Sequence, residues 1–282
     1  MFRFLTSSLA LVLIGTPVPV KDAGASAARG TVAAQPAPAD SPAPDADAER
    51  EFLRLANAAR ALAGLGALQM DAGMTKAARA HTAAMIRQQE LSHQFPGEPA
   101  LMQRLMATSS LHLDRAGENV GYSNSVAQGH DGLMHSPPHR ENLLDPDYNV
   151  AGIGAMWSGP AVYVTEDFGR SLPTYSAADA EKAIAASIAR TRHDAVVPTL
   201  RRIDNAAAGS TACAMAKADS IDVPLPHDHT ILRYTTMRPQ DLPGSVTRLI
   251  NDPQLQGFAV GVCYARTSTY PSGVYWAVLI LY

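Results

Sequence analysis

LMHSPPHRENLLDPDYNVAGIG, from Leu133 to Gly154, contains a helix start, a helix end and the beginning of a strand. Ser136 is expected to be the N-cap of a short helix, because its hydroxyl can accept a hydrogen bond from a free amide of the first turn. Pro137 suits the first helical position, where a missing N–H costs nothing. An Asp-Pro-Asp turn ends the helix, and a strand is expected from Val150 to Met156. His139 therefore lies in the first helical turn, shortly before a strand.

Two further motifs precede this stretch: Leu91-Ser92-His93 and Gly117-Glu118-Asn119. Together with SPPHRENLLDPDYNVAGIG, they resemble the HS, GEN and SPGHR-x-NIL…Y-x-x-IGVG motifs of bacterial CAP superfamily (SCP-like) domains. The superfamily includes the cysteine-rich secretory, antigen 5 and pathogenesis-related proteins. The resemblance covers Ala48–Arg170. It implies an α-β-α sandwich with a surface cavity that carries two histidines and acidic groups, and that takes a divalent metal in some members.

The resemblance also implies which residues form this cavity. The expected cavity residues are His93, Glu118, Asn119, His135, Ser136 and His139. Among them, His93, Glu118 and His139 are the expected ligands of a weakly bound Zn²⁺ or another divalent ion, since neutral imidazole suits such metals. Without the resemblance, Glu118 is an ordinary loop glutamate, and with it we expect a carboxylate held by backbone amides at a turn. Some relatives have a second glutamate where this chain has Ser136. Of the four cavity residues in those relatives, this chain has His93, Glu118 and His139 but lacks the second carboxylate.

Composition and motifs exclude several classes of protein. The chain has 282 residues and a net charge of −3, so no broad basic surface favours nucleic acid. Neither the zincin motif H-E-x-x-H nor the nucleophile elbow G-x-S-x-G occurs. Catalytic residues therefore remain unknown. We keep two hypotheses: a protein that binds an extracellular small molecule, lipid or wall component or a divalent metal, and a metal-assisted, peptidase-like hydrolase that uses the same cavity.

The N-terminus predicts export. Met1–Ile14 carries one early charge, Arg3, and an apolar run, and Ala25-Ser26-Ala27 fits a cleavage site. We expect a signal peptide over residues 1–27 and an extended Ala/Pro-rich linker over residues 28–47. The apolar run is too short to span a membrane, and no other stretch is long enough. The protein is therefore expected to be extracellular or periplasmic and not an integral membrane protein.

Apolar periodicity predicts the remaining elements of the first domain. Helices are expected at Ala48–Ala63, Ala72–Gln89 and Val126–Met134, and a hairpin at Ala151–Phe168. His81 falls on the apolar face of the second helix. We interpret it as a hydrogen-bonded core histidine.

Residues 175–282 look like a weakened repeat of residues 48–170, with a helical part followed by a strand, a turn and a strand. We therefore predict an α+β fold, a CAP-type α-β-α sandwich followed by a smaller α+β domain that is a degenerate copy of it. The second half lacks the G-E-N and S-P-P-H-R motifs, and His227 and His229 are its only candidate substitutes. Cys213 and Cys263 are either two buried thiols or, if the repeat is real, a disulfide between helix and strand.

Overall fold

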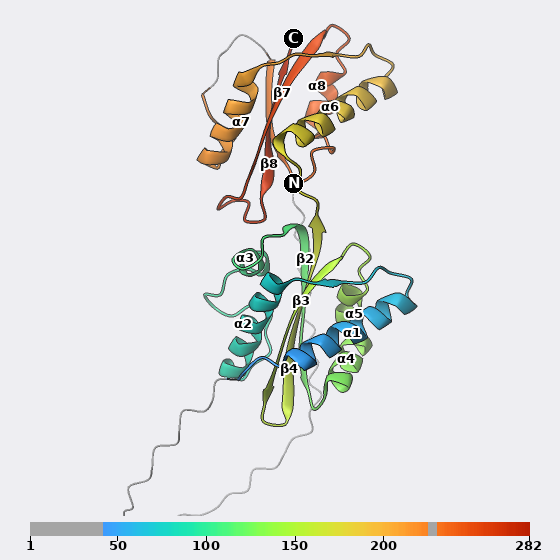
Figure 1. Cartoon of the computed structure of the whole chain (residues 1–282), viewed down its shortest axis with the longest axis vertical. Coiled ribbons are helices and arrows are strands. Elements are labelled where there is room, and N and C mark those ends of the chain that lie inside the picture. Colours follow the sequence, from blue (N-terminus) through green and yellow to red (C-terminus); the bar gives the residue numbers. More distant parts are fainter. Residues whose placement is uncertain (1–41, 225–229) are drawn as a thin grey trace, which may run out of the picture. The chain divides into compact units, whose positions relative to one another are not determined.

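A computed structural model describes residues 42–224 and 230–282, which form two compact units (Figure 1). The first unit runs to Ser109 and continues from Arg115 to Arg170. The second comprises Ser110–Asp114 and Ser171–Tyr282. The predicted signal peptide, most of the linker, and His227 and His229 lie outside the described residues. Within the described ranges, no helix is both long and apolar enough to cross a bilayer.

The first unit is built around a four-stranded sheet with the order β1-β3-β4-β2. β1 runs parallel to β3, and β3 runs antiparallel to β4. The helices begin where the sequence predicts them, because Asp45 and Asp71 cap α1 and α2 with their side chains. In chain order the elements are α1 (Ala46–Leu62), β1 (Gln69–Met70), α2 (Ala72–Gln88), α3 (Leu101–Met106), β2 (His112–Ser123), α4 (Val126–His135), α5 (Pro137–Leu143), β3 (Val150–Ser158) and β4 (Ala161–Leu172).

Helices cover both faces of this sheet. On one face α2 lies so close to β3 that a Cβ on Gly152 or Gly154 would overlap the helix backbone. On the other face, Phe52 of α1 and Leu133 of α4 pack with Ile153 and other apolar residues of β3 and β4. Figure 1 shows the three layers. The predicted α-β-α sandwich is confirmed.

The second unit repeats this architecture. Its sheet has the order β5-β7-β8-β6, again with a short parallel strand at one edge and an antiparallel pair at the centre. A Cβ on Gly261 of β7 would overlap the backbone of α7 at Ala208, just as a Cβ on Gly154 of β3 would overlap the backbone of α2 at Ala78. The elements are α6 (Ala177–Asp194), β5 (Arg201–Arg202), α7 (Ala206–Ala218), β6 (Thr230–Thr236), α8 (Gly244–Ile250), β7 (Gly257–Ala265) and β8 (Val274–Leu281).

A buried arginine near the end of the first helix occupies the same place in both units. Arg60 donates from Nε to the carbonyl of Gly66, six residues later, and Arg192 does the same to Pro198. Each then reaches the end of the short helix before the central hairpin. Arg60 binds the carbonyls of Leu143 and Asp145, and Arg192 binds those of Ile250 and Asp252. This shared hydrogen-bonding arrangement supports the predicted repeat, and it shows that α8 of the second unit corresponds to α5 of the first.

One expectation about local structure was wrong, and another was confirmed only in part. Glu118 does not lie at a turn but within the twelve-residue strand β2. The glycines and charges of this segment obscure a strand pattern, and the fixed position of Glu118 comes from the sheet. Ser136 does occupy the N-cap of α5, but its side chain makes no capping hydrogen bond.

The beginning of β2 belongs to the second unit, which differs from the expected division of the chain. His112 is buried there, with Nε2 2.9 Å from the carbonyl oxygen of Met237 and Nδ1 3.2 Å from that of Ser272. Its ring packs edge-on against Tyr264 and Tyr275. Residues 110–114 are therefore part of the core of the second unit, although they precede most of the first unit's sheet in the sequence.

Candidate functional site

Three of the predicted site residues meet at the edge strand β2. His93 comes from the loop after α2, Glu118 from β2 itself, and His139 from the first turn of α5. His93 Nδ1 lies 3.0 Å from Glu118 Oε1, and the ring centres of His93 and His139 are 6.5 Å apart. α2 and α5 cover opposite faces of the sheet. The loop after α2 and the first turn of α5 can approach each other here because β2 is the edge strand of the sheet in the described residues.

Both carboxylate oxygens of Glu118 have partners. Oε1 faces His93, and Oε2 accepts a 2.6 Å hydrogen bond from Arg104. Arg104 also donates to the backbone carbonyl of His93 at 3.2 Å and lies 3.4 Å from Glu98 Oε1. The Glu118 side chain is only 4% exposed. Arg104, which the sequence did not single out, therefore holds the His93 loop against β2 and balances the charge of Glu118.

His81 is a hydrogen-bonded core histidine, as its place on the apolar face of α2 predicted. It is 1% exposed, with Nδ1 2.7 Å from Glu98 Oε1 and Nε2 2.8 Å from the carbonyl oxygen of Ser92. It also lies 3.9 Å from Glu118 Oε2. Its contacts fix the loop that presents His93.

His139 is buried beside His93. Burial lowers the pKa of His139, because the charged imidazolium loses hydration, and positive charge on His93 lowers it further. At neutral pH His139 is therefore the neutral base. Neutral imidazole is the form that binds metals and accepts protons.

Asn119 points to the other face of the sheet from Glu118 and has a supporting role. Its amide donates to the backbone carbonyl of His139 at 3.0 Å and to Glu166 Oε2 at 3.3 Å. Asn142 in turn donates to Asn119 Oδ1 and to the carbonyl of Glu118. These bonds attach α5 to β2 and so set the position of His139.

His135 and Ser136 do not join the cluster. The His135 side chain is 77% exposed, and its Nδ1 lies 2.8 Å from the backbone carbonyl of Asp131, one helical turn earlier. Ser136 is buried at the junction of α4 and α5. The junction places His139, but neither of these side chains has a contact with His93 or Glu118 among those found in the described residues.

The sequence reasoning missed two buried acids on β4, Glu166 and Asp167. Glu166 is 0% exposed and Asp167 1%. Burial raises the pKa of Glu166 to about 7, against the opposing effect of the Asn119 hydrogen bond. Burial also raises the pKa of Asp167 well above its usual range, and the negative charge of hydrogen-bonded Glu118 adds to this rise. Thr165, Glu166 and Asp167 form a consecutive polar run in a strand covered on both faces, and this was the available signal.

The second unit has apolar residues at the corresponding positions. Aligning α5 with α8 places Val246 where the first unit has His139. When the β7–β8 hairpin is matched to the β3–β4 hairpin by register, Leu279 takes the place of Glu166 and Ile280 that of Asp167. All three are buried. The described part of the second unit therefore has a hydrophobic core in place of the polar cluster.

The donor set for a metal is incomplete in the residues that the structure describes. They include no group of three or more His, Cys, Asp or Glu side chains arranged to hold an ion. His93 and His139 remain as two nitrogen donors. Glu118 is engaged by His93 and Arg104 and fits the role of an orienting group better than that of a ligand.

Comparison with known proteins finds similarity in the first unit. Residues 53–168 match the family described as CAP, the cysteine-rich secretory protein family. A relative, the uncharacterized protein YkwD of Bacillus subtilis (strain 168), is 32% identical over 113 residues, which are 39% of this chain. The chain covers 43% of that relative, less than half of its length.

Two solved structures are also similar. One is an extracellular protein containing a SCP domain from Bacillus anthracis str. Ames, with 25% identity and a TM-score of 0.41 over 44% of this chain and 41% of that one. The other is Na-ASP-1, with 8% identity and a TM-score of 0.42 over 83% of this chain and 88% of that one.

Proposed function

We propose that the His93–Glu118–His139 cluster, which lies within the residues 53–168 that match the CAP family, binds a ligand or a divalent metal ion outside the cytoplasm. The observation that carries this proposal is the approach of two imidazole rings, with centres 6.5 Å apart, at the edge strand of the sheet. Metal-bound imidazoles have Zn–N bonds of about 2.0–2.1 Å, which brings two ring centres to about 5–6 Å. A small movement of the His93 loop is enough to reach that separation.

Glu118 acts on His93 rather than on the ion. A carboxylate at Nδ1 fixes the tautomer of a histidine, so that Nε2 is the free base, and it raises the basicity of that nitrogen. Arg104 pairs with Glu118 and holds it in place. The bound group would therefore meet two imidazole nitrogens, with its remaining positions open to water or to an organic ligand. Such a site binds weakly and exchanges readily.

The alternative, a metal-assisted hydrolase, requires a base that deprotonates water. Glu118 was the candidate for that role, but its two oxygens accept from His93 and Arg104. A carboxylate whose two oxygens already face hydrogen-bond donors is poorly placed to accept a proton from water. The geometry therefore favours binding over hydrolysis.

Two features support a location outside the cytoplasm. Residues 1–27 have the composition of a secretory signal. Cys213 and Cys263 are joined in a disulfide, and such bonds persist in oxidising compartments. The natural partner is then an extracellular small molecule, a lipid or a wall component.

Titration with Zn²⁺ tests the proposal. The chain should bind Zn²⁺ near neutral pH, and the affinity should fall by about tenfold or more in His93→Ala and in His139→Ala, because each removes one of two nitrogen donors. Binding should weaken as the pH falls below about 6.5, where imidazoles protonate. The lowered pKa of His139 keeps its nitrogen available further into the acid range than that of an ordinary histidine.

The matched control is His135→Ala, which removes an exposed histidine near the site without touching the cluster. Calorimetry should give this variant the affinity of the unchanged chain. If the His93→Ala, His139→Ala double variant also keeps that affinity, the proposed site is wrong.

A further inference from the structure

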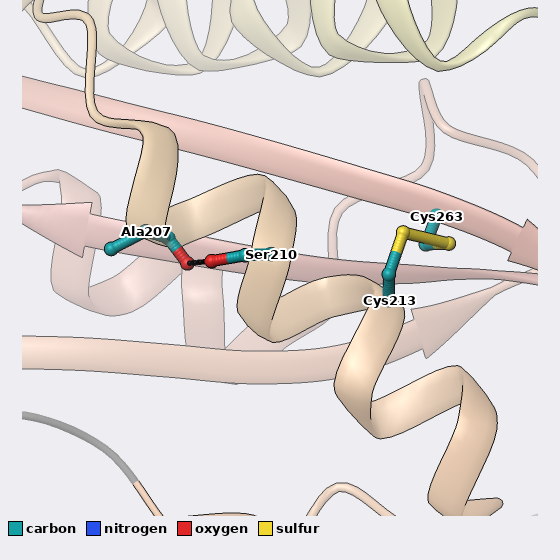
Figure 2. The surroundings of a disulfide bond; sticks show 4 residues. All are labelled: Ala207, Ser210, Cys213 and Cys263. Atoms are coloured by element: carbon teal, nitrogen blue, oxygen red, sulfur yellow. Dashed lines mark hydrogen bonds between the residues drawn. A yellow bond between two sulfur atoms is a disulfide. The ribbon is translucent and has the colours of Figure 1, made fainter.

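The disulfide of the second unit is open to solvent. Cys213 lies on an exposed face of α7, and Cys263 is half-buried on β7, with their Cα atoms 5.0 Å apart (Figure 2). Both cysteines line a surface hollow of about 530 Å³. A small molecule can therefore approach the sulfur atoms while the fold stays intact.

The hollow carries an excess of positive charge. Lys217 lies one helical turn after Cys213, on the same side of α7, and Arg266 lies in the loop after β7. Both line the hollow together with a single acid, Asp219. Asp219 is ionised, because hydrogen bonds from Thr267, Ser268 and Thr269 hold its pKa at about 2. Arg266 also donates from Nη2 to the backbone carbonyl of Leu111 at 2.8 Å, a neutral acceptor. Among the residues that line the hollow, two cations stand against one carboxylate, which favours an anion.

The elements joined by the disulfide are also held together without it. Asp219, at the C-cap of α7, accepts from Thr267 Oγ1 at 2.6 Å, from Ser268 Oγ at 2.7 Å and from the amide of Thr269 at 2.9 Å. The apolar face of α7 packs against the sheet through Ala208, Ala212 and Met215 on one side and Trp276 and Val278 on the other. The walls of the hollow should therefore keep their positions when the sulfur–sulfur bond is broken.

We propose that Cys213–Cys263 is a thiol–disulfide exchange site for small anionic thiols, that is, thiols that carry carboxylates. The thiolate of the small molecule attacks Sγ of Cys213, which belongs to the more exposed residue of the pair. A new S–S bond forms, the Cys213–Cys263 bond breaks, and its electron pair leaves on Cys263 as a thiolate near Lys217 and Arg266.

A second thiolate completes the reaction. It attacks the sulfur of the small molecule in the mixed disulfide and releases Cys213 as a thiolate. In sum, two small thiols are oxidised to one disulfide, the protein disulfide is reduced to two thiols, and the two protons of the small thiols pass to the two cysteines. The reverse reaction re-forms the bond from a small disulfide.

Reduction rates of the native chain with three thiols test the proposal. The probes are mercaptoacetate (anionic), 2-mercaptoethanol (neutral) and cysteamine (cationic), each corrected for its thiolate fraction and its intrinsic nucleophilicity. At low ionic strength mercaptoacetate should react about fivefold faster than 2-mercaptoethanol, the factor for one charge pair in a water-like medium, and cysteamine should react more slowly. Added salt and Lys217→Gln should each reduce this preference.

Lys182→Gln is the matched control, because Lys182 is an exposed lysine of α6 in the same unit that does not line the hollow. It should leave the preference unchanged. Equal corrected rates for the three thiols, or a reduction rate that is independent of thiol concentration and equal to the rate of unfolding, would overturn the proposal.

Trapping the intermediate tests the direction of attack. Peptide mapping after quenching with acid should find mercaptoacetate on Cys213, and a label on Cys263 alone would contradict the assignment. Near-ultraviolet circular dichroism of the reduced, alkylated chain should stay native-like, since Asp219 still ties α7 to the loop. Loss of that signal would show that the bond is structural only.

Discussion

Replacing Arg60 with alanine should lower the free energy of unfolding of the first unit by about 3–5 kcal/mol, the usual cost of breaking a buried charged network. Arg60 is 1% exposed and donates to the carbonyls of Gly66, Leu143, Asp145 and Tyr148 at 2.8–2.9 Å. Without the guanidinium these acceptors lose their donor, and each unsatisfied buried group costs about 1–3 kcal/mol. The loss should also release the segment that follows α5.

Urea unfolding followed by circular dichroism, with hydrogen exchange resolved by peptide, measures this effect for each unit. Arg192→Ala should destabilise the second unit in the same way, since Arg192 binds the carbonyls of Pro198, Ile250 and Asp252. Arg54→Ala is the control, because Arg54 is exposed and pairs only with Glu51, one turn away. If Arg60→Ala and Arg54→Ala unfold at the same urea concentration, the carbonyl network does not carry the stability assigned to it.

Glu166→Gln should stabilise the chain at alkaline pH and have little effect near pH 4.5. Glu166 has a pKa of about 7 when folded, above its ordinary value of 4.5. The folded state therefore binds more protons than the unfolded chain between these values, and stability is lost as the pH rises from about 4.5 to 7. A shift of this size corresponds to roughly 3 kcal/mol. Glutamine stays neutral and keeps an oxygen that accepts from Asn119, so the variant does not lose stability as the pH rises.

Thermal or urea unfolding from pH 4.5 to 8 gives the two stability profiles. The difference between variant and parent should grow with pH and level off above about 7. Glu141→Gln, at an exposed position of α5, should run parallel to the parent at every pH. A Glu166→Gln profile that also runs parallel would mean that Glu166 is ionised at no cost in the folded state.

The sequence predicted the helices and the central hairpin because their signals are local. Asp45 and Asp71 are side-chain caps, and apolar residues at helical spacing mark the buried faces of α1 and α2. The strand that carries Glu118 was not predicted. Gly117 and Gly121 break the alternation that identifies a half-buried strand, and pairing with β4, far along the chain, is what makes β2 a strand.

The candidate site was predicted in part for the same reason. Motifs located His93, Glu118 and His139, but contacts between distant segments decided their surroundings. The sequence predicted the hairpin, but its local pattern does not show that helices cover both faces of β4 and bury Glu166 and Asp167. The role of Arg104 depends on Glu118, fourteen residues later, which no local pattern reveals.

Residues 110–114 constrain the order in which the two units can fold during synthesis. His112 is buried by contacts with Met237 and Ser272, which lie 125 and 160 positions further along the chain and are therefore synthesised later. The second unit cannot complete its core until these residues have been made, and it then needs a segment that was synthesised much earlier. Although the two units have the same architecture and follow each other in the sequence, they cannot fold independently one after the other. A gene fragment cut after Arg170 would leave His112 without the partners that bury it.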